Sequence, residues 1–243
     1  MRNLRYLIFF PLFAAGAGIY GLTLAAGAGG LLGYTFTRYT MEGEGLESTQ
    51  KMDRADYGGF LFFDTRYAEF SMLIQGGKNN YEETMFTTDT SLTNKDKGTG
   101  SEVSLGFSLA GKYPFFVSEK ISWFPLLGID YQIALKQRRK PEGQPEYDRS
   151  KGQGISSADV DKNGNNYPLG AWNALWIKVG GGLDYHFSGA FFLRSELLFG
   201  FRLQTGYETG AFEVVEDLLH VTDPKLAGLT GNPSLKIGIG YQF

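Results

Sequence analysis

The chain has 243 residues, of which 42% are hydrophobic and 15% aromatic, and its formal net charge is −3. It contains no cysteine, which excludes a disulfide framework, a thiolate metal site and lipidation of a cysteine. The slightly acidic charge gives no support to nucleic-acid binding. A mean hydropathy of −0.19 is too polar for a bundle of membrane-spanning helices.

The first segment has the order of an export signal. "MRNLR" carries two positive charges, a long uncharged apolar run follows, and the small residues "AAGAGG" close the segment. We expect cleavage after Ala25, or as late as Ala28, so that residues 1–25 form a signal peptide and residues 29–243 the mature domain. The alternative is a retained membrane anchor, which the proline and the glycines inside the apolar run disfavour.

Most of the remaining chain alternates between apolar and small or polar residues, which predicts strands with one apolar face. In "VSLGFSLAG", for example, Val103, Leu105, Phe107 and Leu109 share one face. A soluble sheet would also alternate, but its strands usually have about 5–6 residues, and the longer segments here suit tilted strands that cross a bilayer. We expect eight strands, near residues 31–40, 57–63, 67–76, 101–113, 119–135, 171–187, 191–206 and 233–243.

Two of these expected strands fit the pattern poorly. "YGGFLFF" at 57–63 does not alternate cleanly, and Pro125 removes a hydrogen-bond donor inside the fifth strand.

The segments between the expected strands alternate in length. The long ones, near 41–56, 77–100, 136–170 and 207–232, are rich in polar residues, whereas "DTR", "YPFFVSE" and "SGA" are short. An even number of antiparallel strands with short turns at one end and long loops at the other predicts an all-β, up-and-down transmembrane barrel.

The last nine residues, "LKIGIGYQF", alternate strictly and end on an aromatic residue. They resemble the C-terminal assembly signal of bacterial outer-membrane barrels, in the positions Leu235, Ile237, Ile239, Tyr241 and Phe243. With the export signal and the loop pattern, the chain resembles the small eight-stranded proteins of the OmpA-transmembrane, OmpX and OmpW type, or a spirochaete-like variant of them. The resemblance implies location in the cell outer membrane, contact with its lipid, and recognition of the last strand by the barrel-assembly machinery.

Charged residues on the opposite face should point into the lumen. A barrel of eight strands is only wide enough to be filled by its own side chains, so these charges should pair rather than line a pore. Counting from the short turns places three pairs at matching depths: Asp184 with Arg194, Asp130 with Lys178, and Glu196 with Lys236.

Three further segments were weighed for binding. "DVDKNGNN" begins like a calcium loop with Asp159, Asp161 and Asn163, but the position of the bidentate glutamate is Gly170, and such stretches are also ordinary turns. "KQRRK" at 136–140 either contacts anionic lipid headgroups at the outer rim or is the solvated base of a loop. Residues 212–219 have helical spacing and could form a short helix over the barrel or an adhesive surface.

Catalysis has little support, because the chain has only two histidines, His186 and His220, and no serine–histidine motif. No cofactor is expected. The sequence favours a surface-exposed structural or interaction protein of the adhesin or antigen type, with a filled lumen and loops that bind a host or envelope ligand. The alternatives are a narrow OmpW-like channel for small hydrophobic or amphiphilic solutes and, less favoured, a lipid-active barrel enzyme.

Overall fold

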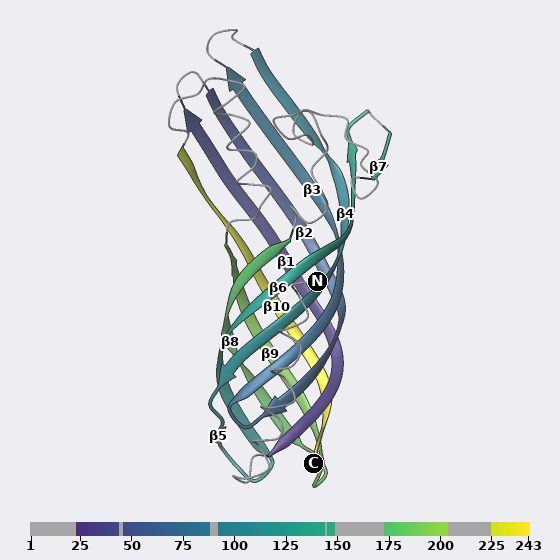
Figure 1. The fold of residues 1–243 in the computed structure, drawn as a ribbon, viewed down its shortest axis with the longest axis vertical. Helices are drawn as coiled ribbons and strands as arrows, with labels where there is room; N and C mark the ends of the chain where they lie inside the picture. Colours follow the sequence, from purple (N-terminus) through teal and green to yellow (C-terminus); the bar gives the residue numbers. More distant parts are fainter. Residues whose placement is uncertain (1–22, 44–45, 88–91, 144, 149–172, 204–224) are drawn as a thin grey trace, which may run out of the picture.

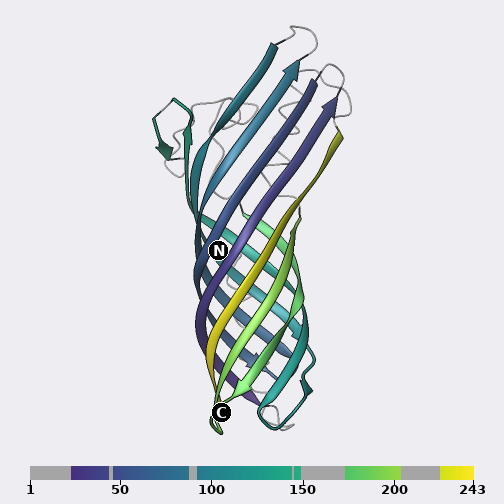
Figure 2. The ribbon, with the colours of Figure 1, turned by 180° about the vertical axis from the view of Figure 1, so that it is seen from behind.

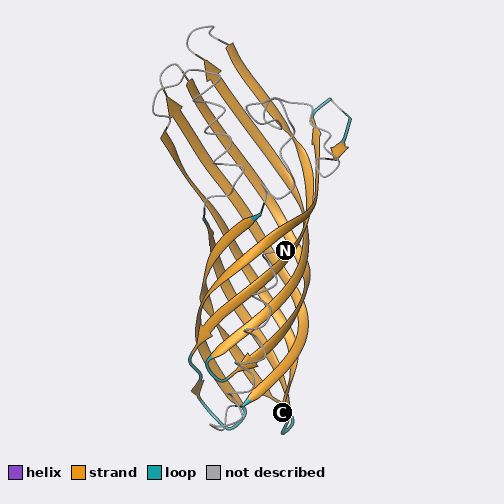
Figure 3. Cartoon of the chain, viewed as in Figure 1, coloured by secondary structure: helices purple, strands orange, loops and turns teal. Residues whose placement is uncertain are grey.

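The computed structural model describes residues 23–43, 46–87, 92–143, 145–148, 173–203 and 225–243. Within these ranges the regular structure is entirely strand (Figure 3). None of these residues forms a helix long and apolar enough to cross a membrane.

Eight long strands close into a ring (Figure 1). They are β1 Leu24–Gly43, β2 Leu46–Thr65, β3 Ala68–Thr87, β4 Leu92–Lys112, β6 Ile121–Pro141, β8 Ala174–His186, β9 Phe191–Arg202 and β10 Lys225–Gln242. Two short strands, β5 Phe115–Phe116 and β7 Tyr147–Asp148, pair with β6. Each long strand is antiparallel to the next along the chain, so the predicted eight-stranded up-and-down barrel is confirmed.

The last strand closes the ring against the first. β10 pairs with β1 from Ala25↔Gln242 to Glu42↔Lys225 (Figure 2). The amide of Phe243 donates to the carbonyl of Leu24 at 2.8 Å. The chain terminus therefore has its backbone groups paired on both sides and is part of the wall.

The barrel is apolar outside and polar inside. Along β6, residues from Ser122 to Gln132 alternate strictly between buried and exposed. Leu127 on the outer face is 63% exposed, whereas Asp130 on the inner face is fully buried. The exposed apolar face predicted for the C-terminal segment is also present, with Ile237 and Ile239 about half exposed. Because a soluble sheet would bury these residues, this inversion indicates a wall that faces lipid.

The strands are longer than the sequence predicted. Most of 41–56 and 77–100, expected as loops, belongs to the ladders β1–β2–β3–β4, and residues 136–141 and 225–232 also lie in strands. These segments are polar on both faces, so they show no alternation from which a strand could be predicted. The first strand also begins earlier than expected, at Leu24.

Pro125 is accommodated without a break in β6. On one side β6 pairs with β4 as far as Lys112↔Leu126 and then with β5 from Phe115↔Trp123. Pro125 lies between these two stretches, at a position without a partner on that side, where a missing donor does no harm.

Four phenylalanines fill the lumen beside the charges. Phe60, Phe62, Phe124 and Phe192 point inward and are at most 3% exposed. Glycines on nearby strands make room for three of these rings: a Cβ at Gly27 would collide with Phe62, one at Gly182 with Phe124, and one at Gly240 with Phe192. Inward glycine opposite inward phenylalanine is therefore the packing rule of this narrow barrel.

Candidate functional site

The end of the barrel that holds the short turns 66–67, 113–120 and 187–190 and the C-terminus is called the turn end, and the opposite end the loop end. At the turn end the lumen is crossed by Arg194. Its Nε and Nη2 donate to the two carboxylate oxygens of Asp184 at 2.8 and 2.7 Å. Nη1 donates to Glu69 and Nη2 also to Asp64, both at 2.6 Å. The guanidinium lies 4.7–5.2 Å from the ring centroids of Phe62, Phe124 and Phe192.

Two more ion pairs lie deeper in the lumen. Lys178 Nζ is 3.1 Å from Asp130 Oδ2, and Lys236 Nζ is 3.5 Å from Glu196 Oε2. All four residues are at most 3% exposed. The structure thus brings together all three pairs that the sequence placed at matching depths, with Asp184 directly opposite Arg194 in the β8–β9 register.

A third layer lies toward the loop end. Arg54 joins Asp56 and Glu102, with nitrogen–oxygen distances of 2.6 and 2.7 Å. Thr35 and Asn232 both donate hydrogen bonds to Asp56. This layer connects β10, β1, β2 and β4, so it fixes one half of the ring from inside.

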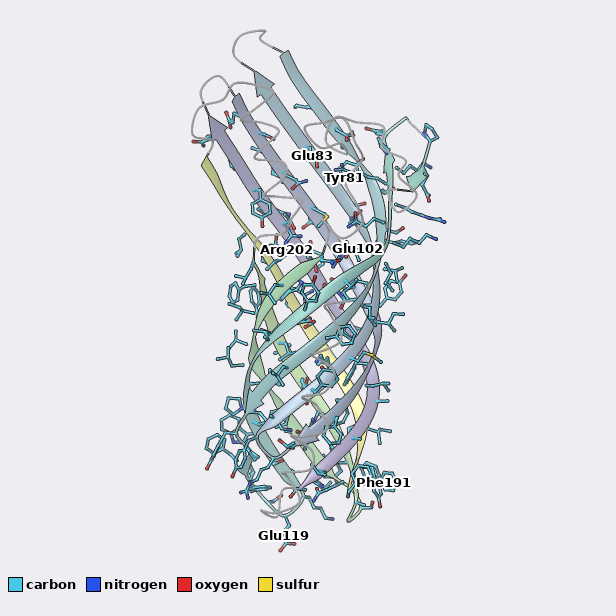
Figure 4. The ribbon with its side chains drawn as sticks, viewed as in Figure 1. Tyr81, Glu83, Glu102, Glu119, Phe191 and Arg202 are labelled. Atoms are coloured by element: carbon cyan, nitrogen blue, oxygen red, sulfur yellow. The ribbon has the colours of Figure 1, made fainter. Side chains whose placement is uncertain are left out.

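Above that layer a cavity of about 100 Å³ opens at the loop end. Tyr81, Glu83, Glu102 and Arg202 lie around it (Figure 4). Arg139 stacks on Tyr81 at 3.8 Å and donates to Glu83 at 2.6 Å. The indole N–H of Trp176, a lining residue, is buried and has no hydrogen-bond partner among the described residues. Farther out, Lys97 pairs with Glu142 at 2.9 Å, and this hydrogen bond raises the pKa of Lys97.

The turn end has a separate vestibule of about 570 Å³. Asp64, Lys112, Asp184 and Arg194 form its inner wall, and His186 also lines it, with its ring 5.3 Å from that of Phe192. The described residues that line this vestibule are all different from those that line the loop-end cavity. The charged and aromatic layers between them separate the two.

Sequence reasoning missed half of this network. Glu69 and Asp64 bind Arg194, and Lys112 binds Asp64, yet sequence analysis predicted only Asp184 as a partner of Arg194. All three lie at inward positions beside short turns, so extending the residue count across the first two turns would have placed them at the same depth.

Other predicted features fall differently. Asp159, Asp161, Asn163, Gly170, His220 and residues 212–219 lie outside the described residues. Within the described ranges no group of three or more histidine and acidic residues could hold a metal ion. Residues 136–140 are part of β6 and not of a loop base, which corrects that expectation: Arg139 points inward, whereas Arg138 and Lys140 are exposed.

A closed ring of strands with an apolar exterior and a charged, filled interior satisfies every requirement of a membrane-crossing sheet. The chain therefore has the fold of a membrane-crossing, eight-stranded β-barrel of the outer-membrane type. In barrels of this type the short turns face the periplasm, so we expect the turn end there and the loop end outside the cell.

No protein-family model and no curated protein matches the sequence. Among solved structures, the chain is similar to OprG from Pseudomonas aeruginosa, with 11% identity, a TM-score of 0.43, and coverage of 91% of this chain and 95% of that one. It is also similar to Ail of Yersinia pestis, solved with the heparin analogue sucrose octasulfate, at 11% identity and a TM-score of 0.30, covering 90% and 99%. The similarity to Neisserial surface protein A has 12% identity and a TM-score of 0.32, and it covers 89% of this chain and 99% of that one. These comparisons do not support a spirochaete variant.

Proposed function

We propose that this barrel is a surface-exposed interaction protein of the adhesin type, in which the lumen is an anchor and the strands above the membrane bind the partner. The observation that carries the proposal is the side-chain bridge of Arg194 across the lumen to Glu69. A bridge of buried, paired charges closes the route that a solute would take.

The wall of the barrel is uneven in height, which supports this function. β8 and β9 reach only Ala174 and Arg202 at the loop end, whereas β1–β4 continue well beyond that level (Figure 1). From Tyr34 to Gly43, β1 runs for nine further residues. At about 3.3 Å per residue and a tilt of about 40°, this raises the hairpins roughly 20 Å above the lipid.

The raised part has a surface suited to water and to polar partners. One row of outward residues across neighbouring strands reads Arg38, Lys51, Glu82, Lys97 and Glu142. Such a mixture of both charges would be costly against acyl chains, so this surface is available to a protein or glycan outside the cell.

Exposure of the hairpins can be tested with single thiols, because the chain has no cysteine. Glu47→Cys places a thiol near the β1–β2 tip, and Glu119→Cys places one in an exposed turn at the opposite end (Figure 4). A membrane-impermeant maleimide applied to intact cells should label the first and not the second. The reverse labelling would contradict the orientation on which the proposal depends.

Binding itself is tested by shortening the hairpins. Replacing residues 38–51 and 82–97 with tight turns should leave a heat-modifiable barrel, since the lumen layers lie below them. Cells that carry the shortened barrel should adhere less to cultured host cells than cells that carry the full barrel at equal surface density. Equal adherence would show that the hairpins do not bind.

The competing function is a narrow channel, favoured by the cavity at the loop end and the vestibule at the turn end. Refolded protein in planar bilayers should show no reproducible single-channel steps. Steps that depend on Arg194 would replace the proposed function with conduction.

The proposal includes no catalytic step. His186 packs on Phe192, and removing its imidazole should change no lipid turnover. Loss of a measurable phospholipase or acyltransferase activity in His186→Ala would instead establish an enzyme.

A further inference from the structure

Outward-facing basic residues gather at one place on the wall. In the strand register Lys78 on β3 is opposite Ser101 on β4, which is opposite Arg138 on β6. Lys136 and Lys140 lie two residues to either side of Arg138 on the same strand. Lys78, Lys136, Arg138 and Lys140 are called the basic patch.

The basic patch carries a surplus of positive charge. Lys78, Arg138 and Lys140 are exposed and Lys136 is half-buried. Arg138 pairs with Glu146 at 3.1 Å. Among the described residues the three lysines have no acidic partner within salt-bridge distance. Asp148 on β7 is also opposite Arg138 in the strand register. With Glu146 and Asp148 included, the patch therefore holds two more positive than negative charges.

The basic patch lies directly above the lipid-facing belt. On β3 the next outward residues toward the turn end are Gly76 and Ile74, and on β4 they are Val103 and Leu105. Ile74 is 55% exposed. The eight residue steps from Phe70 to Lys78 span about 20 Å along the membrane normal at a tilt of about 40°. The patch thus begins where a belt of membrane thickness ends.

Among the described residues just above the lipid-facing belt, β1, β8 and β9 show no such surplus of positive charge. On β1, Arg38 is neutralised by Asp53 through two hydrogen bonds of 2.8 and 2.9 Å. On β8 and β9 the outward residues near the loop end are apolar, including Leu175 and Phe201. An ordinary girdle of lysines would surround the barrel, so a one-sided patch indicates a bound group.

The outer wall beside the basic patch has a gap in its side chains at Gly76. Gly76 lies between Tyr57 on β2 and Val103 on β4 in one outward row, so a notch without a side chain is flanked by an aromatic ring and a valine. Lys78 and Arg138 are two strand spacings apart, about 10 Å between their Cα atoms. Their side chains can reach a single phosphate above Ser101.

We propose that the basic patch binds the phosphate groups of a phosphorylated glycolipid in the outer leaflet, whose acyl chains lie on the belt of β3, β4 and β6. Charge complementarity selects the phosphate, and continuity with the belt selects a lipid rather than a free anion.

The test uses full-length protein refolded in detergent and titrated with bisphosphorylated lipid A, with the same lipid after enzymatic removal of its phosphates, and with inorganic phosphate. The lipid variant is K78A/K136A/K140A. Its matched control is K51A/K95A/K120A, which removes the same charge from exposed lysines elsewhere. Binding is followed by native mass spectrometry and by the heat-modifiability midpoint.

Wild-type protein should bind the phosphorylated lipid more tightly than the dephosphorylated one. Each lysine near the headgroups should contribute on the order of fivefold, so the lipid variant should bind on the order of 100-fold more weakly. The control should bind like wild type, and inorganic phosphate should not compete.

Unchanged binding by the lipid variant, equal binding of the two lipids, or competition by inorganic phosphate would each overturn the proposal. If the triple variant folds poorly, the single change K78E provides the same comparison against K51E.

Discussion

Arg194 on β9 donates from Nη1 to Glu69 on β3 at 2.6 Å, and these two strands are separated by three others in either direction around the ring. The two side chains, joined by this hydrogen bond, therefore span the full diameter of the lumen. Arg194 is 1% exposed and also binds Asp184 and Asp64, so one guanidinium links β9 and its neighbour β8 to β2 and β3 on the opposite side of the ring.

This geometry predicts that removing Arg194 and removing Asp184 lower the stability of the barrel by different amounts. Arg194→Ala leaves the three buried carboxylates of Asp64, Glu69 and Asp184 without the guanidinium that they share and should lower the free energy of unfolding by about 3–5 kcal/mol. Asp184→Ala should cost less, because Asp64 and Glu69 still balance the guanidinium. The double variant should cost less than the sum. Urea unfolding in lipid vesicles measures all three.

Equal losses from the two single changes would show that Asp184 alone balances Arg194. Additive losses in the double variant would show that the two side chains are not coupled.

The fit between glycine and phenylalanine predicts a second set of variants. Gly182→Val should force the ring of Phe124 out of place and cost about 1–3 kcal/mol by overpacking. Adding Phe124→Leu should restore part of the loss. Gly30→Ala faces outward, with its nearest neighbour 3.9 Å from the new Cβ, and should be nearly neutral. If Gly30→Ala lowers stability as much as Gly182→Val, these glycines are needed for the backbone conformation and not to make room for a phenylalanine ring.

The strands that cross lipid could be predicted because one side of each faces acyl chains. That asymmetry produced the alternation at 101–113, 119–135 and 191–206, and the short turns then fixed the register that places Asp184 opposite Arg194. Alternation with a lipid-facing side is a property of each strand alone, so it can be read from a single sequence.

The remaining features depend on the whole ring. Phe60 and Phe62 in "YGGFLFF" disturb the alternation because they fill the lumen, and their fit requires glycines on other strands. The upper parts of β1–β4 have water on both faces and so carry no pattern. Glu69 reaches Arg194 only because β3 and β9 face each other in a closed ring of eight.

The pairing of β1 sharpens the expected processing site. Ala25 to Ala28 pair with both β2 and β10, and Leu24 pairs with β2. A start at Ala26 removes two of these residues, whereas a start at Gly29 removes all five and leaves backbone groups unpaired in lipid, at several kcal/mol each. We therefore expect the mature chain to begin at Ala26 or earlier. N-terminal sequencing of the folded protein, isolated as the heat-modifiable band on a gel, tests this expectation. A stable barrel that starts at Gly29 would contradict it.

The final strand should be needed for closure and assembly. Tyr241 pairs with Ala26 on one side and Phe191 on the other, and its ring lies 5.0 Å from that of Phe191 and 5.2 Å from that of Phe243. Deleting Tyr241–Phe243 removes two aromatic anchors and opens the ladder at its end. The truncated chain should accumulate unfolded in the periplasm, measured as loss of the heat-modifiable band from the outer membrane.

Single substitutions in the same strand separate lipid contact from lumen packing. Ile237 is 49% exposed on the outer face, so Ile237→Arg places a cation in lipid at about 2–4 kcal/mol near the midplane. Gly238 points inward, where a Cβ would lie 2.8 Å from the carbonyl of Ala28 and 3.1 Å from Phe60, so Gly238→Arg acts by collision. Ile237→Leu keeps an apolar surface and should assemble normally. If the deletion variant and both arginine variants assemble as well as the Ile237→Leu variant, the last strand is not the element that closes this barrel.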